Sequence, residues 1–226
     1  MRYIQRQSSF ARGLHWIHTI ACMSLFVTGI MLFVPAVASS VGVGAMQGAR
    51  TIHRVMAVIF IAAPLLGVAV NPKGFIHFMK CMFYKWDAND WKFMGKFFPY
   101  LFLGPAKQHM PEQKELKSGQ AFSDWIILAL ALLISVSGVF LWLSAAGVEI
   151  SGVLALWMLV AHDVAFVLLG LLMIIHIYLG AGVFQPYRGS VRLMFGDGRV
   201  PESDALYHWG TWAREEFQKG DHISAD

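Results

Sequence analysis

Charged side chains are scarce in this sequence. Of its 226 residues, 14% are Asp, Glu, Lys or Arg, whereas 57% are apolar. Soluble globular domains carry about 25% charged residues, so the composition excludes an ordinary soluble domain and indicates an integral membrane protein. The formal net charge is only +4, and the basic residues flank apolar runs, which argues against nucleic acid as a partner.

Cysteine is nearly absent. Cys22 lies in an apolar run and Cys81 in a basic, aromatic segment, and no CxxC or CxxCH motif is present. Covalent attachment of a c-type haem and a cysteine-ligated iron–sulfur cluster held by this chain alone are therefore both excluded.

Several apolar runs reach the length of about 20 residues that a helix needs to cross a membrane. We predict an all-α integral membrane protein, a bundle of four transmembrane helices. The predicted spans are 13–35, 51–70, 122–145 and 153–184. Ser8 or Ser9 is expected to cap the first helix.

The segments between the spans differ in character. Residues 38–48 are rich in Ser and Gly and predict a loop. Residues 72–118 mix Lys with Trp, Phe and Tyr and are expected to be broken at Pro105 and Pro111. This mixture predicts an interfacial amphipathic segment between helices 2 and 3. The membrane domain is expected to cover 1–185, followed by a C-terminal tail, 186–226.

Basic residues are distributed unevenly among the loops. Eight lysines lie between Lys73 and Lys117, and the N-terminus and the tail are also basic, the tail including Arg188. The other two loops carry almost no Lys or Arg. Since cytoplasmic loops are enriched in Lys and Arg, both termini are predicted to be cytoplasmic.

Histidine is abundant in or beside the spans, where ionisable residues are costly and therefore candidates for function. A packing histidine with one hydrogen bond is the alternative for any single position. The five candidates are His15, His18, His53, His162 and His176. The remaining four, expected to be solvated or interfacial, are His77, His109, His208 and His222.

Helix direction sorts four of these histidines into two depths. His15 near the start of the first span and His176 near the end of the fourth share the cytoplasmic half. His53 and His162 share the outer half. His18, one turn from His15, is an alternative ligand to it.

Two of the histidines lie on one helix. His162 and His176 are 14 residues apart, about 21 Å and nearly four turns of an α-helix, so both leave the same helix face. This spacing predicts two bis-histidine haems b, one above the other. Because both axial positions of each iron are filled, the predicted chemistry is outer-sphere electron transfer.

Other residues near these histidines are candidates for supporting roles. Arg12 and Arg54 could neutralise haem propionates or contact lipid phosphates. Asp163 could orient the neighbouring imidazole. Gly29 and Gly138 would let a porphyrin approach, or allow close helix packing.

Five motifs occur in a characteristic order: RGLHW at 12–16, RTIHR at 50–54, SGQ at 118–120, AHDVAF at 161–166 and IIHIYLG at 174–180. Together they resemble the cytochrome b (gamma) subunit of membrane-bound respiratory formate dehydrogenases. The resemblance implies that His53 and His162 bind the outer haem, and that His15 and His176 bind the inner one.

The resemblance also implies a site for quinone, expected to be menaquinone, beside the inner haem. The implied quinone-binding residues are Lys117, Gly119, Gln120 and His176. Lys117 stands where the family has an asparagine, so the hydrogen bond to a quinone carbonyl would come from a lysine amine. An interfacial lysine that reaches toward the headgroups is the alternative.

The implied partners are an iron–sulfur subunit and a molybdenum or tungsten formate dehydrogenase subunit, in a higher oligomer in a bacterial or archaeal cytoplasmic (inner) membrane. This chain would not itself act on formate. Related cytochromes serve nickel–iron hydrogenases and thiosulfate or polysulfide reductases, which stay open as partners. A non-haem membrane anchor or a metal or proton channel is the alternative of another class.

Overall fold

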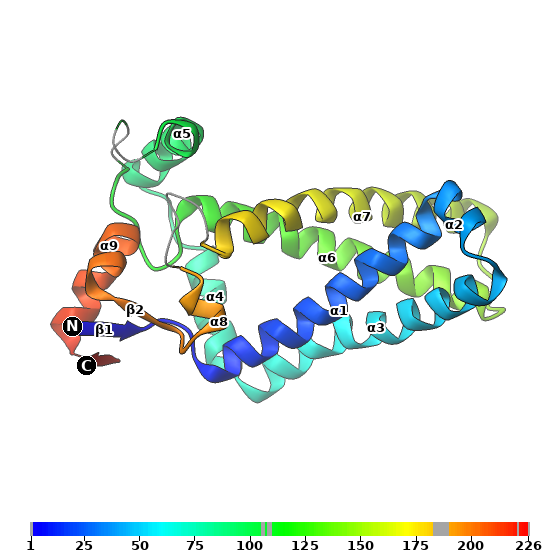
Figure 1. Cartoon of the computed structure of the whole chain (residues 1–226), viewed down its shortest axis with the longest axis horizontal. Coiled ribbons are helices and arrows are strands. Elements are labelled where there is room, and N and C mark those ends of the chain that lie inside the picture. Colours follow the sequence, from blue (N-terminus) through cyan, green and yellow to red (C-terminus); the bar gives the residue numbers. More distant parts are fainter. Residues whose placement is uncertain (1, 105–106, 108–109, 183–189, 221, 226) are drawn as a thin grey trace. The chain divides into compact units, whose positions relative to one another are not determined.

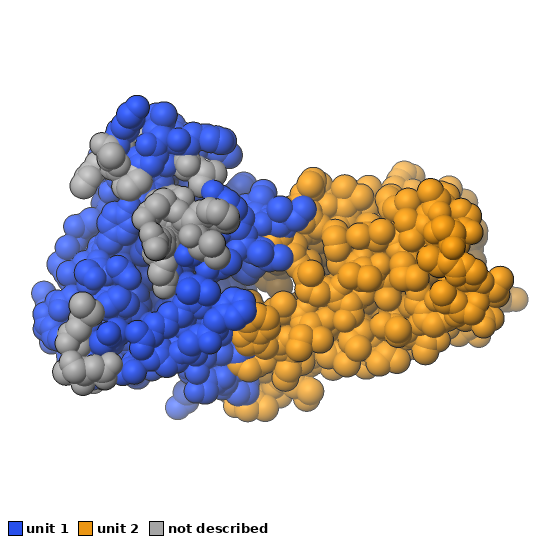
Figure 2. Space-filling view, viewed as in Figure 1, with its two compact units in different colours: residues 1–12, 73–125, 174–226 blue, residues 13–72, 126–173 orange. Residues whose placement is uncertain are grey.

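The structure is a computed structural model. It describes residues 2–104, 107, 110–182, 190–220 and 222–225. Pro105, His109, Arg188 and the predicted boundaries at 184–186 lie outside these residues. The chain forms two compact units (Figure 2). Unit 1 comprises residues 1–12, 73–125 and 174–226, and unit 2 comprises residues 13–72 and 126–173.

Four long helices confirm the predicted fold class. They are α1 (Ser9–Phe33), α3 (Val43–Val70), α6 (Ser118–Ala145) and α7 (Gly152–Gly180). Each is long and apolar enough to cross a membrane. Many of their large apolar side chains are exposed, including Leu65, Leu132 and Val153. Such a surface is stable against lipid and costly in water.

The first two spans differ from the prediction at their connection. Residues 38–48 are not a loop, because α2 (Pro35–Ser40) and the first turns of α3 occupy them. Gly and Ser cost a helix only about 1 kcal/mol or less per residue relative to Ala, so the break is limited to residues 41–42, where Gly42 has a φ of 62°. Ser8 does cap α1, since its hydroxyl oxygen accepts from the backbone N–H of Ala11 at 3.1 Å.

Glycines bring the helices of unit 2 close together, and the four helices lie side by side there (Figure 1). A Cβ added at Gly170 on α7 would meet the ring of Phe26 on α1 at 2.5 Å. A Cβ at Gly29 on α1 would meet Phe166 on α7 at 2.9 Å. The absence of side chains at these positions is thus required by helix packing.

The predicted interfacial segment belongs to unit 1 and contains two helices, α4 (Pro72–Met82) and α5 (Ala88–Leu103). Asp87 caps α5 in a reciprocal arrangement with Asp90. Apolar side chains of α5 such as Trp91 and Phe98 are exposed, at 66% each. Exposed aromatic rings of this kind fit the headgroup level of a bilayer.

Both ends of the chain meet in a small antiparallel sheet of unit 1, which the sequence did not predict. Its order is β2 (Arg199–Pro201), β1 (Arg2–Gln5) and β3 (Ile223–Ala225). The tail also contains α8 (Arg192–Phe195) and α9 (Glu202–Lys219). A buried cluster joins β1 and β2 to α9: Ile4, Val200, Ala205, Trp209 and Ala213. Strands of three or four residues are too short for a recognisable alternation of apolar and polar residues.

Replacing Gly170 with Leu should destabilise unit 2 by about 1–3 kcal/mol, because the new side chain would displace the Phe26 ring. The measurement is thermal unfolding of the detergent-solubilised protein. Gly48→Leu on α3 is the control, since nothing lies within 4 Å of a Cβ there. Equal stability of the two variants would contradict this packing.

Candidate functional site

Two of the predicted ligands face each other in unit 2. His53 lies on α3 and His162 on α7, and their ring centroids are 6.4 Å apart. Two metal–imidazole bonds of about 2 Å each, plus about 1 Å from nitrogen to ring centre on each side, would separate the centroids by about 6 Å. The pair is therefore spaced for one metal ion between the two rings.

The proton on His53 can be assigned from its hydrogen bonds. The hydroxyl of Thr28 on α1 donates to the carbonyl of Ser24 at 2.8 Å. Its oxygen lies 2.8 Å from Nδ1 of His53. With the hydroxyl proton directed to that carbonyl, Nδ1 of His53 is the donor. Nε2 of His53 therefore presents a lone pair, which is the form that binds a metal.

His162 is oriented in the same way from α6. Its Nδ1 lies 3.1 Å from the carbonyl oxygen of Ile134 and 3.2 Å from the hydroxyl of Ser137. A carbonyl oxygen can only accept, so Nδ1 carries the proton and Nε2 is free to ligate. These contacts, and not Asp163, orient the ring. No local pattern pointed to Thr28 or Ser137, because neither lies near a histidine in the chain.

A glycine adjoins the same ring. A Cβ added at Gly138 would lie 3.1 Å from Cε1 of His162. Gly138 thus leaves room for the imidazole, whereas Gly29 serves helix packing against Phe166. The donor set of two neutral imidazoles, each held by its second nitrogen, fits the axial ligands of a haem iron.

His15 and His18 both lie on the part of α1 that belongs to unit 2. Nδ1 of His15 is 3.5 Å from the hydroxyl of Thr19. His18 stacks on Phe60 at 4.3 Å, and its Nδ1 is buried without a hydrogen-bond partner among the described residues. Both histidines remain candidate ligands.

His176 lies near the end of α7, in unit 1. Its pairing with His15 of unit 2 stays a prediction. An uninterrupted helix contains both His162 and His176, as the 14-residue spacing requires.

The two candidate propionate contacts differ. The guanidinium of Arg12 donates to the backbone carbonyls of Gln7 at 2.9 Å and Asp197 at 2.6 Å. Arg12 thus fastens the start of α1 to the loop before β2. Arg54 is exposed on α3, beside His53. Contact of either arginine with a propionate stays a prediction.

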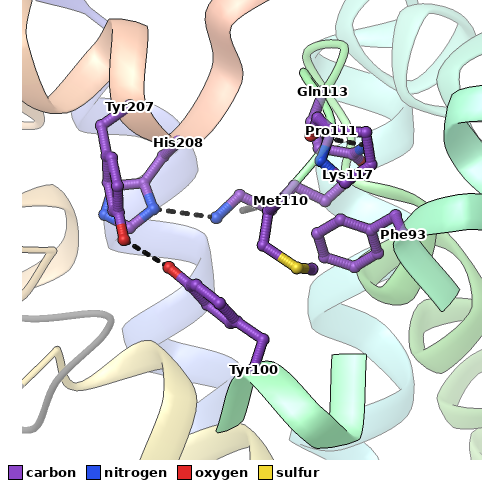
Figure 3. Close-up of a pocket in the computed structure, with 8 residues that line it drawn as sticks. All are labelled: Phe93, Tyr100, Met110, Pro111, Gln113, Lys117, Tyr207 and His208. Atoms are coloured by element: carbon purple, nitrogen blue, oxygen red, sulfur yellow. Dashed lines mark hydrogen bonds between the residues drawn. The ribbon is translucent and has the colours of Figure 1, made fainter. Parts of the chain in front are cut away.

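Of the predicted quinone residues, Gly119 and Gln120 lie in the first turn of α6 and Lys117 directly precedes this helix, all in unit 1. Nζ of Lys117 is 3.1 Å from Nδ1 of His208, and both line the pocket drawn in Figure 3. A Cβ at Gly119 would lie 3.0 Å from Phe93, another residue of that pocket.

The prediction for His208 was wrong, because this residue is buried, at 9% exposure. Its neighbours Tyr207 and Trp209 are aromatic, but only the folding of α9 shows which side chains of this stretch are buried. The other two described histidines outside the spans, His77 and His222, are exposed.

A positive charge on the amine of Lys117 is unfavourable. Burial and the nearby guanidinium of Arg6 lower the pKa of Lys117 to about 7. Burial, Lys117 and Arg6 lower the pKa of His208 to about 3. His208 is therefore neutral, and its Nδ1 accepts a hydrogen bond from the amine. The amine can lose or gain a proton near neutral pH.

Comparison with known proteins identifies a family. A family model described as prokaryotic cytochrome b561 matches residues 6–197, which include all four predicted ligands. No curated protein matches the chain. Proteins of the matched family are membrane helical bundles that bind haem b.

The hydroxyl of Thr28 should be needed for tight haem binding. Thr28→Val leaves Nδ1–H of His53 without an acceptor, and loss of such an outer contact costs about 10–100-fold in metal-site affinity. Haem retained after purification measures the effect. Thr51→Val on α3, the helix of His53, is the control, because its hydroxyl bonds only to the carbonyl of Gln47 among the described residues. Full haem retention in Thr28→Val would contradict the role of the Thr28 hydroxyl as the acceptor for Nδ1–H of His53.

Lys117 should titrate near pH 7, neutral above that pH and charged below it. NMR of the protein after reductive ¹³C-methylation of its lysines measures this directly, and Lys117→Arg assigns the signal. Lys114 is the internal control: burial lowers its pKa, but hydrogen bonds to Asp87 and Asp90 raise it on balance. A Lys117 signal that titrates with the exposed lysines would contradict the burial of this amine.

Proposed function

The chain belongs to the prokaryotic cytochrome b561 family, and on this basis we propose that it is the dihaem subunit that connects a respiratory oxidoreductase with the quinone pool. It is a multi-pass membrane b-type cytochrome that functions in electron transfer. The number of haems, quinone and the catalytic partner are the parts that we propose.

The observation that carries the proposal is the His53–His162 pair. A haem b held there would supply one-electron transfer. Its iron would have both axial positions filled by imidazole, so dioxygen or peroxide would find no open coordination site. The chain's own contribution is to hold two neutral imidazoles at a fixed separation among apolar side chains.

A second haem is proposed at His15 and His176. Support comes from the spacing along α7, which sets His176 nearly four turns from His162 on the same helix face. His18 is the alternative partner on α1.

Quinone is proposed to bind at Lys117, Gly119, Gln120 and His176, which all belong to unit 1. Reduction to quinol takes two electrons and two protons. The amine of Lys117 has up to three hydrogens, so it can donate to a quinone carbonyl while it bonds to His208. We propose that it also supplies one of the protons, drawn from the cytoplasm, where we propose that both termini lie.

The proposed partners are an iron–sulfur subunit and a molybdenum or tungsten formate dehydrogenase subunit, on the strength of the motif resemblance. A hydrogenase or a thiosulfate or polysulfide reductase would use the same cytochrome geometry. The proposed electron flow is from substrate oxidised at the outer face to quinone, which would build a membrane potential worth about 2.3 kcal/mol per charge per 100 mV.

Haem stoichiometry tests the proposal. The purified chain should show b-type bands in a reduced-minus-oxidised spectrum and two haems per chain by pyridine haemochrome assay. His53→Ala and His176→Ala should each remove one haem, and His176→Ala should also abolish quinone reduction. His222→Ala is the control, because this exposed histidine should not affect either haem. A chain without haem would favour an anchor or channel, and two haems in His176→Ala would reject that ligand.

A further inference from the structure

Three side chains that the proposed function does not use converge in unit 1. His77 and Cys81 lie on α4, and Glu115 lies in the segment before α6. Nε2 of His77 is 2.9 Å from a carboxylate oxygen of Glu115. Sγ of Cys81 is 3.7 Å from that nitrogen and 3.8 Å from that oxygen.

Local structure explains this convergence. Residues four apart on a helix lie on the same face, which places Cys81 one turn beyond His77. Cys81 packs against a buried cluster of Met82, Leu116 and Ala121. Leu116 follows Glu115 directly, so the same cluster that holds α4 also fixes the carboxylate.

The backbone of Glu115 has a second anchor. A guanidinium nitrogen of Arg6 donates to its carbonyl oxygen at 2.5 Å. Arg6 is itself held over the rings of Trp209 and Trp212, at 4.1 and 4.7 Å. The three potential ligands therefore stand on backbone that is fixed by packing, which lowers the ordering cost of binding an ion between them.

The separations match those of a tetrahedral site. Zinc bonds to nitrogen and oxygen at about 2.0–2.1 Å and to sulfur at about 2.3 Å, which puts tetrahedral ligands roughly 3.3–3.6 Å apart. The observed separations of 2.9, 3.7 and 3.8 Å scatter around these values. Shifts of a few tenths of an ångström would complete the geometry.

We propose that His77, Cys81 and Glu115 bind a zinc-class divalent cation, with water as the fourth ligand. Thiolate, imidazole and carboxylate together select a borderline transition metal over Mg²⁺ or Ca²⁺. A neutral imidazole, a thiolate and a carboxylate carry two negative charges, which balance a divalent ion. The exposed position of His77 leaves one side of the ion open to water.

Binding requires two proton changes. The thiol of Cys81 releases its proton to solvent, because thiolate is the ligand form. Without a cation, Nε2 of His77 can donate to Glu115, so binding moves that proton to Nδ1 or to solvent. The ion then replaces the His77–Glu115 hydrogen bond and joins α4 to the segment before α6.

Zinc content of the full-length, detergent-solubilised protein tests this proposal independently of haem and quinone. After equilibration with Zn²⁺ and removal of free ion, mass spectrometry of the metal should find about one zinc per chain. X-ray absorption at the zinc edge should show one sulfur and otherwise nitrogen or oxygen neighbours. Haem iron does not contribute at that edge.

Variants make the test specific. His77→Ala and Cys81→Ala should each weaken zinc binding by at least about 10-fold, because even outer contacts of metal ligands are worth that much. Cys22→Ala and His222→Ala are the matched controls and should keep the zinc. Glu115→Gln, which preserves side-chain shape, should also weaken binding if the alanine variants fold poorly. Zinc bound equally by all variants, or a spectrum without sulfur, would overturn the proposal.

Discussion

A polar nitrogen among apolar side chains needs a hydrogen-bond partner, and this need organises the centre of unit 2. All four long helices contribute: His53 from α3, His162 from α7, Thr28 from α1 and Ser137 from α6. Each hydroxyl donates to a carbonyl of its own helix. With the hydroxyl protons so directed, Nδ1 of each ring donates, and Nε2 of each is left free to ligate a metal.

In unit 1, burial constrains the charge of two basic side chains. The cations of Arg6 and Lys117 share the ring of Trp209, at 4.1 and 4.8 Å. Their mutual repulsion and burial favour a neutral amine beside His208. Glu115 and Lys117 are two residues apart, so the proposed cation site and the proposed quinone site share one short segment of chain.

The long apolar runs made the four helices predictable, because a helix is the stable form for a lone apolar segment in lipid. The features that the sequence analysis did not predict share one cause, which is a weak local sequence signal. Residues 38–48 contain only mild helix breakers, and β1 and β3 are too short to show a pattern. His208 stands between Tyr207 and Trp209, outside the apolar spans, and its burial follows from the packing of α9 around Trp209.

The sequence by itself determined which histidines lie in or beside long apolar runs and the 14-residue spacing along α7, since helix rise and pitch are constant. The tertiary structure decided what each of them touches. The decisive contacts join residues 25 apart at His53 and at His162, 91 apart at Lys117 and 34 apart at Cys81. Local propensity cannot specify such pairs, because only the packed fold brings them within hydrogen-bond distance.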